Sequence, residues 1–121
     1  MSTISTHVLD TVLGKPAAGI AVRLERLEGG WAGQGADRVD DGQWIRIATG
    51  VTDDDGRCRD LAPKAAQGIY RLSFETGPYL RRLGRASIYP EISITFTCRG
   101  EAHYHLPLLL SDNSYTTYRG S

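Results

Sequence analysis

Short runs in which apolar and polar residues alternate constrain the fold of this chain more than any other feature. The run Ile92–Cys98 alternates without interruption, and similar patterns occupy Gly68–Phe74, residues 19–27 and residues 44–48. A period of two is typical of a strand that buries one face and exposes the other. The inward-facing side chains expected from these runs include Ile20, Val22, Leu24, Tyr70, Leu72 and Phe74.

Turn-forming residues separate the alternating runs. Asp53-Asp54-Asp55-Gly56 predicts a tight turn in which Gly56 supplies a positive φ. Residues 78–84 begin with Pro and end with Gly, which indicates one short helix. Short strands, regular turns and one helix together predict an all-β fold, an antiparallel β-sandwich of two sheets. We expect residues 1–121 to form a single domain, because this length suffices for one core.

The stretch around residues 28–43 does not follow this pattern. It is rich in Gly and Asp, contains one Trp and shows little periodicity. We expect a longer peripheral loop or hairpin there, without a second domain.

Charge and cysteine content exclude several classes of partner. The chain has 14 basic and 14 acidic residues, so nucleic acid or an anionic membrane is not expected as the main partner. No signal-peptide pattern follows Met1 and no apolar stretch is long enough to span a membrane. We therefore expect a cytoplasmic protein in which Cys58 and Cys98 are reduced and act as small buried hydrophobic residues.

The chain's three histidines lie close to its two ends. His7 follows the N-terminus, while His103 and His105 precede the C-terminal residues 118–121. Histidine suits proton transfer because its ordinary pKa, roughly 6.5, lies near neutrality. This arrangement indicates a site where the termini meet; the alternative is that the histidines are ordinary polar surface.

The C-terminal run, residues 103–111, alternates as well. His103 and His105 should point one way and Tyr104 and Leu106 the other; if the Tyr104 face lies on the core, both histidines face solvent or an interface. Pro107 within this run predicts an edge strand or a bulge, since proline cannot donate a ladder hydrogen bond. An apolar edge strand is normally covered, so we expect an oligomer whose interface uses it.

Arg57 follows the turn at Gly56, and Arg59 should share its strand face. A guanidinium can bind a planar carbonyl or carboxylate group through two hydrogen bonds; the alternative is a surface arginine paired with a nearby aspartate. The chain has no GxSxG elbow, P-loop or dinucleotide fingerprint. His103 and His105 could chelate a metal with His7, but no carboxylate or thiol is placed to complete the set, so no metal is expected.

Segments spread over nearly the whole chain carry a joint pattern: residues 5–10 (STHVLD), 14–17 (GKPA), 51–57 (VTDDDGR), 68–70 (GIY), 89–91 (YPE), 103–111 (HYHLPLLLS) and 118–121 (YRGS). Together they resemble the transthyretin-like family and, within it, the enzymatic branch of 5-hydroxyisourate hydrolases. The terminal YRGS is the most specific piece, because in this family it separates the enzymes from the hormone-carrying transthyretins. One departure is Asp112-Asn113, where relatives usually have Pro followed by an aromatic residue.

The resemblance implies two stacked sheets and a homotetramer with active sites at the dimer–dimer interface. It implies His7, Arg57, His105 and Ser121 as catalytic residues, and His7, Arg57 and Tyr118 as substrate-binding residues. His103 is not carried over, because the functional histidine of the family matches His105. The implied partner is a small purine-derived substrate, and no cofactor is implied.

The implied reaction is hydrolysis of 5-hydroxyisourate to 2-oxo-4-hydroxy-4-carboxy-5-ureidoimidazoline in urate degradation. A histidine, either His105 or His7, would act as general base on a water that attacks a ring carbonyl. Arg57 would stabilise the charge that develops on the carbonyl oxygen, and Tyr118 would orient the substrate. The rival readings are a transthyretin-like carrier of small aromatic hormones and a purely structural β-sandwich module.

Overall fold

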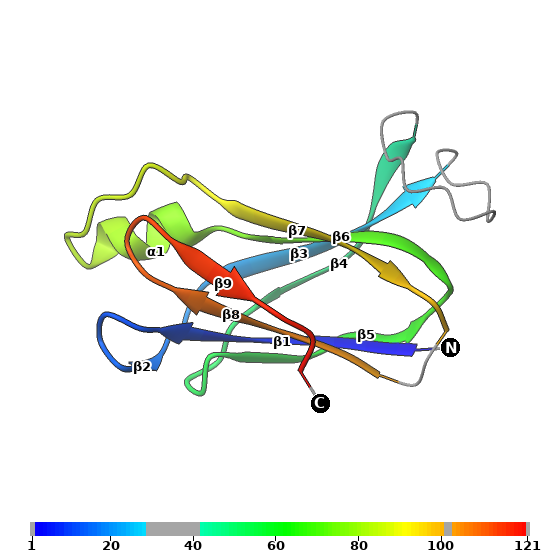
Figure 1. Ribbon diagram of the computed structural model, residues 1–121, viewed down its shortest axis with the longest axis horizontal. Coiled ribbons are helices and arrows are strands. Elements are labelled where there is room, and N and C mark those ends of the chain that lie inside the picture. The colour runs from blue at the N-terminus through cyan, green and yellow to red at the C-terminus, as the bar shows by residue number, and fades with distance from the viewer. Residues whose placement is uncertain (1, 29–41, 101–102, 121) are drawn as a thin grey trace.

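The computed structural model describes residues 2–28, 42–100 and 103–120, and in them the chain forms two stacked β-sheets with one short helix at one end (Figure 1). One sheet contains β1 (Ser2–Asp10), β2 (Lys15–Pro16), β5 (Arg57–Ala65), β8 (His103–Leu110) and β9 (Tyr115–Thr117). The other contains β3 (Ala21–Glu28), β4 (Gln43–Val51), β6 (Gly68–Phe74) and β7 (Ile92–Cys98). The helix is α1 (Thr76–Arg82). The predicted all-β sandwich is therefore confirmed.

The core lies between the two sheets and follows from the alternation of the strands. Leu24 of β3 and Leu72 of β6 are fully buried, and Ile4 and Leu108 face them from the other sheet. Burying one such side chain contributes about 1.5–3 kcal/mol. The expected inward-facing residues are all buried: Ile20, Val22, Leu24, Tyr70, Leu72 and Phe74.

One strand pair is parallel, and it joins the two ends of the chain. β1 and β8 run side by side, and their register pairs Ser5 with His105 and His7 with Pro107. Alternation along single strands carries no information about this pairing. Because side chains that are paired across neighbouring strands project from the same face, the register brings the histidines of both chain ends together.

The edge-strand prediction for β8 is wrong. β8 lies between β1 and β9, and Leu108 pairs with Thr117 of β9. On the N-terminal side of Pro107, β8 pairs again with the C-terminal segment through a bridge between His105 and Gly120. This bridge keeps the register of the β8–β9 pair. Pro107 therefore interrupts the ladder without placing the strand at the edge, because it has no N–H to donate. We expected an oligomer because an apolar edge strand needs a cover. Since β8 is not an edge strand, this argument for an oligomer no longer applies.

The helix begins at Thr76, earlier than the predicted start at Pro78. Proline is tolerated in a first turn because the first N–H groups of a helix have no partner within it. The N–H of Gly77 donates instead to the carbonyl of Pro90, 3.1 Å away, which holds this turn against the segment before β7.

Cys98 is buried as expected, and Cys58 is half-buried against the core. Most of the expected loop around residues 28–43 lies outside the described residues. Within the described ranges, no helix is long and apolar enough to cross a membrane.

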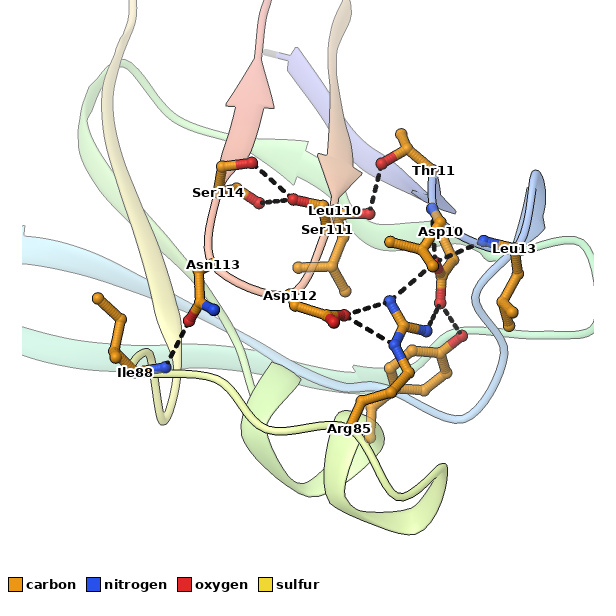
Figure 2. Close-up of polar contacts among 12 residues, drawn as sticks. Asp10, Thr11, Leu13, Arg85, Ile88, Leu110, Ser111, Asp112, Asn113 and Ser114 are labelled. Carbon is orange, nitrogen blue, oxygen red and sulfur yellow. Dashed lines mark hydrogen bonds and ion pairs between the residues drawn. The ribbon is translucent and has the colours of Figure 1, made fainter.

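A cluster of polar side chains joins several elements at the end of the sandwich where α1 lies (Figure 2). We call it the Asp10–Arg85 cluster, and its members are Asp10, Tyr79, Arg85 and Asp112. Arg85 Nη1 lies 2.6 Å from Asp10 Oδ2, and Arg85 Nη2 lies 2.7 Å from Asp112 Oδ1. Tyr79 donates its hydroxyl hydrogen to Asp10 Oδ2 over 2.8 Å. The cluster connects β1, α1 and the turn that leads into β9.

The Asp10 carboxylate is fully buried but well compensated. Burial alone would raise the pKa of Asp10, yet the hydrogen bonds from Arg85 and Tyr79 outweigh it and the pKa is lowered. Burial and the hydrogen bond to Asp10 raise the pKa of Tyr79 to about 12. Nearby, Asn113 accepts a hydrogen bond from the Ile88 N–H over 2.8 Å, so the Asp112-Asn113 turn is attached through both of its side chains (Figure 2).

Candidate functional site

Side chains from three strands meet on the outer side of the sheet that contains β1, β5 and β8, and we call this surface the histidine face: His7, Arg57, His103 and His105. The ring centroids of His7 and His105 lie 6.4 Å apart. The rings of His103 and His105 are stacked, 6.1 Å apart with an interplanar angle of 8°. Tyr104 and Leu106, on the opposite side of β8, are buried, so the two histidines face outward.

His105 is half-buried, and its imidazole has a hydroxyl neighbour. Its Nδ1 lies 2.8 Å from Ser5 Oγ, the side chain that the β1–β8 register places beside it. Burial lowers the pKa of His105 below its ordinary value of 6.5, and the electrostatic effects of Arg57, His103 and His7 lower it further. His105 is therefore neutral at pH 7 and able to accept a proton.

Arg57 reaches the histidine face because of the turn that precedes β5. Asp53 Oδ1 accepts hydrogen bonds from the N–H groups of Asp55 and Arg57, each over 2.9 Å. Gly56 has a φ of +76°, and a Cβ there would lie 2.3 Å from the carbonyl oxygen of Val8. Only glycine fits so tight a turn against β1, and the turn sets the register in which Arg57 pairs with His7.

A hollow of ≈ 280 Å³ opens on the histidine face, and its walls are Ser5, Thr6, Arg57, Arg59, His103 and His105. Among the described residues these walls carry two guanidinium groups and no carboxylate. Asp55 pairs with Arg59 at 3.8 Å, but both side chains are mostly exposed, so this pair neutralises little. The hollow is thus suited to a small, polar, electron-rich ligand.

A larger hollow of ≈ 390 Å³ lies beside β3 and β4, and its charged groups are Arg23, Arg46 and Glu75. Among the described residues its lining contains no histidine, the side chain best suited to proton transfer. We therefore place the candidate site at the histidine face, where size and proton-transfer chemistry coincide.

The C-terminal residues pack against the backbone of β8. The N–H of Gly120 donates to the carbonyl of His105 over 2.7 Å, and a Cβ on Gly120 would lie 2.9 Å from His105 Cδ2. Arg119 donates to the carbonyl of His103 over 2.9 Å, and its guanidinium lies 4.2 Å from the centroid of the Tyr104 ring. The tail therefore packs against the backbone and ring of His105.

The structure brings three of the five sequence-predicted site residues together: His7, Arg57 and His105. Tyr118 follows β9 but is 53% exposed and does not line the hollow in the described part of the protein. Ser121 lies outside the described residues. Sequence reasoning missed Ser5, because only the parallel register of β1 and β8 places it beside His105. Within the described ranges no group of three or more His, Cys, Asp or Glu side chains could hold a metal ion.

Comparison with known proteins establishes the family. The model of the HIUase/Transthyretin family matches residues 4–120. The protein is 42% identical to the 5-hydroxyisourate hydrolase of Mus musculus over 123 aligned residues, which cover 99% of this chain and 96% of that protein. The chain belongs to the HIUase/Transthyretin family, and the resemblance seen in its sequence is confirmed.

Solved structures of both branches superpose on this fold. The 5-hydroxyisourate hydrolase of Klebsiella pneumoniae gives a TM-score of 0.82 with 38% identity and covers 100% of both chains. Transthyretin from Sparus aurata gives a TM-score of 0.83 with 32% identity, covering 99% of this chain and 97% of that chain. Because the two scores are nearly equal, the backbone alone does not distinguish the branches, and the side chains of the site must do so.

Proposed function

We propose that this protein is a 5-hydroxyisourate hydrolase that acts in urate degradation. The observation that carries the proposal is the hollow on the histidine face, where a neutral His105 lies beside His7 and Arg57. The name and the 42% identity of the mouse relative over nearly the full chain support it.

His105 is the proposed general base, in preference to His7. The lowered pKa of His105 leaves it unprotonated at pH 7, and the Ser5 hydroxyl fixes its orientation. His105 takes a proton from a water molecule while the water oxygen bonds to a ring carbonyl carbon of the substrate. The carbon–nitrogen bond then breaks, and the proton passes from His105 to the departing nitrogen. The product carries a new carboxylate and is 2-oxo-4-hydroxy-4-carboxy-5-ureidoimidazoline.

Arg57 binds the polar edge of the substrate and stabilises the negative charge that develops on the carbonyl oxygen. Arg57 and His105 line the same hollow, so substrate held by Arg57 meets His105, and the His7 ring lies 6.4 Å from the His105 ring, outside the walls of the hollow. His7 binds the substrate and takes part in proton transfer. These roles are the ones implied by the family resemblance, and the geometry of the three side chains supports them.

The terminal residues complete the proposed site. Tyr118 orients the substrate through its hydroxyl, and Ser121 acts in catalysis from the end of the tail. The attachment of Gly120 to the His105 backbone supports a tail that reaches the site. The reaction consumes only water and substrate, so we propose that it needs no cofactor.

We also propose a homotetramer with the histidine face at the dimer–dimer interface. The hollow opens on the surface of one chain, whereas hydrolytic sites work best when bulk water is excluded. A second copy placed against this face would supply the missing cover. Light scattering on the purified protein tests the assembly. We retain the cytoplasm as the predicted compartment.

The alternative function is a carrier of small aromatic hormones on the same fold. A carrier channel is mainly apolar, whereas this hollow carries arginine and histidine side chains. A structural module without a ligand would give no reason for arginine and histidine side chains to gather around a hollow. Both alternatives predict that the protein does not change the lifetime of 5-hydroxyisourate.

The test follows the ultraviolet decay of 5-hydroxyisourate, generated in place from urate by urate oxidase. We expect decay faster than the spontaneous rate, with a product heavier by one water and bearing a carboxylate by ¹³C NMR. If micromolar folded protein leaves the decay rate of 5-hydroxyisourate unchanged, the proposal is contradicted. That result would favour a carrier or a structural module.

A further inference from the structure

Two neighbouring histidines of β8 each have a hydroxyl partner on β1. Ser5 Oγ lies 2.8 Å from His105 Nδ1, and Thr3 Oγ1 lies 2.5 Å from His103 Nδ1. The parallel register creates both pairs, since it sets Thr3 opposite His103 and Ser5 opposite His105. Ser5 is 7% exposed, so water competes little for its hydroxyl group.

The His105 ring is held along two of its edges. Ser5 occupies the Nδ1 edge, and Gly120 approaches so closely on the other side that a Cβ there would lie 2.9 Å from Cδ2. The ring nitrogen that remains for chemistry is Nε2. A neutral imidazole carries one proton, so Nε2 can accept a proton only when Nδ1 already has its own.

We propose that Ser5 is a positioning residue that accepts a hydrogen bond from the Nδ1–H of His105 and so keeps Nε2 available as the proton acceptor. This inference rests on the proposed hydrolase function. Ser5 itself gains and loses no proton in the reaction. When Nε2 takes the proton from water, Nδ1 keeps its hydrogen, so the same Ser5 oxygen accepts the same hydrogen bond throughout.

The opposite arrangement, in which Ser5 donates to Nδ1, does not serve a base at Nε2. Nε2 would then carry the proton and could not accept another. In the imidazolium state both nitrogens carry hydrogen, so a donating hydroxyl would have to turn around. A hydroxyl that accepts in both states avoids this reorganisation, and its bond strengthens when the ring becomes charged.

Three variants test the role of Ser5. Ser5→Ala removes the hydroxyl, Ser5→Thr restores it, and Thr3→Ala is the matched control because Thr3 makes the same contact with His103. We expect Ser5→Ala to lower kcat roughly tenfold with little change in KM, which is the size of one hydrogen bond's net contribution. Ser5→Thr should restore most of kcat, and Thr3→Ala should leave it within about twofold.

The pH profile supplies a second readout. The groups around His105 are His7 on β1, Arg57 and Arg59 on β5 and His103 on β8, whereas Arg119 of the tail lies over the Tyr104 ring. None of these changes in Ser5→Ala. The Ser5 oxygen accepts a hydrogen bond that stabilises the imidazolium form of His105. Its loss should lower the pKa of His105 and so move the acidic limb of the pH profile of kcat to lower pH.

A third readout does not depend on activity. The ¹⁵N chemical shifts of His105 distinguish the Nδ1–H tautomer from the Nε2–H tautomer, which predominates in free histidine. We expect Nδ1–H in the unaltered protein and in Ser5→Thr, and a shift toward Nε2–H in Ser5→Ala.

Unchanged kcat and unchanged nitrogen shifts in Ser5→Ala would overturn the inference, as would an Nε2–H tautomer in the unaltered protein. An equal loss of kcat in Thr3→Ala would also overturn it, because the effect would then not be specific to His105. If the unaltered protein does not accelerate substrate decay, the hydrolase proposal fails, but the nitrogen shifts still decide whether Ser5 holds His105.

Discussion

The Asp10–Arg85 cluster and the histidine face are two polar groupings of this sandwich whose charges are arranged in opposite ways. In the cluster one guanidinium lies between two carboxylates, at 2.6 Å from Asp10 and 2.7 Å from Asp112. On the histidine face two guanidinium groups and the imidazoles of His103 and His105 surround a hollow without a carboxylate wall among the described residues. Both groupings depend on β1, which ends in Asp10 and carries Ser5 and His7 earlier along its length.

This difference in charge compensation indicates a structural role for the Asp10–Arg85 cluster and a catalytic role for the histidine face. A buried charge that is paired and hydrogen-bonded, as Asp10 is, can remain ionised in the folded state and fixes the elements that it joins. Two guanidinium groups beside a hollow without a carboxylate wall among the described residues attract an electron-rich ligand. We therefore expect changes in the cluster to alter stability and changes on the histidine face to alter catalysis.

The largest expected effect is on catalysis. His105→Asn removes the proposed base while keeping a polar side chain of similar reach. We expect kcat to fall by about 10²–10⁴-fold, the contribution of a placed general base, with the thermal midpoint nearly unchanged. Stopped-flow decay of 5-hydroxyisourate measures the rate, and calorimetry measures the midpoint. A variant that loses both together would make His105 a structural residue.

The next effect is on stability. Asp10→Asn leaves Arg85 and Tyr79 facing a neutral amide in a fully buried position. We expect the free energy of unfolding in urea to fall by about 3 kcal/mol, with kcat of the folded protein preserved. Asp112→Asn is the matched control, because its side chain is 41% exposed and should cost less than about 1 kcal/mol. Equal costs at the two positions would contradict the importance of burial.

The same carboxylate gives the cluster a pH dependence. The pKa of Asp10 is lowered in the folded protein from its ordinary 3.8, so its contribution is complete above that value. It is lost as the pH falls further, through the lower folded pKa. Asp10→Asn should therefore lose part of the acid destabilisation below about pH 4.

A smaller effect is expected where the tail meets the site. Gly120→Ala would place a Cβ 2.9 Å from His105 Cδ2 and 3.3 Å from the His105 carbonyl oxygen. Either the ring or the tail must move, and we expect kcat to fall on the order of tenfold, since small displacements of a catalytic group are costly. A nuclear Overhauser contact between residue 120 and the His105 ring reports the displacement. Unchanged kcat with the contact preserved would show that the site tolerates this shift.

The smallest effect to be measured is a shift of one titration, separate from the large loss of kcat that Arg57→Gln should also cause because Arg57 stabilises the developing charge. The positive charge of Arg57 lowers the pKa of His105, second only to burial. Arg57→Gln removes that charge and should raise the pKa of His105, so the acidic limb of kcat moves to higher pH. A proton NMR titration of His105 measures the shift directly. A downward shift would contradict the proposed proximity of the two side chains.

Much of the fold could be predicted from the sequence because alternation reports burial locally. Gly68–Phe74 and Ile92–Cys98 form strands with the predicted bounds, and Gly56 has the predicted positive φ. The prediction that β8 is an edge strand was wrong. A proline shows only that one N–H is missing, and it does not show which strands lie on either side of β8. The two-residue strand β2 and the short strand β9 show no alternation long enough to detect.

The residues of the candidate site also separate into those that could be predicted from the sequence and those that could not. His7, Arg57 and His105 could be named from the sequence, because their chemistry and the family resemblance both point to them. Ser5 could not, since its contact with His105 depends on the parallel register of strands almost a whole chain apart. The Asp10–Arg85 cluster could not be found either, because it joins residues from β1, the segment after α1 and the turn before β9.

The most direct test of this contrast is the initial rate of 5-hydroxyisourate loss per folded protomer, measured side by side for the unaltered protein, His105→Asn and Asp10→Asn. We predict a rate well above spontaneous decay for the unaltered protein, a similar rate for Asp10→Asn and a rate near the spontaneous one for His105→Asn. Equal rates for the unaltered protein and His105→Asn would contradict the assignment of catalysis to the histidine face.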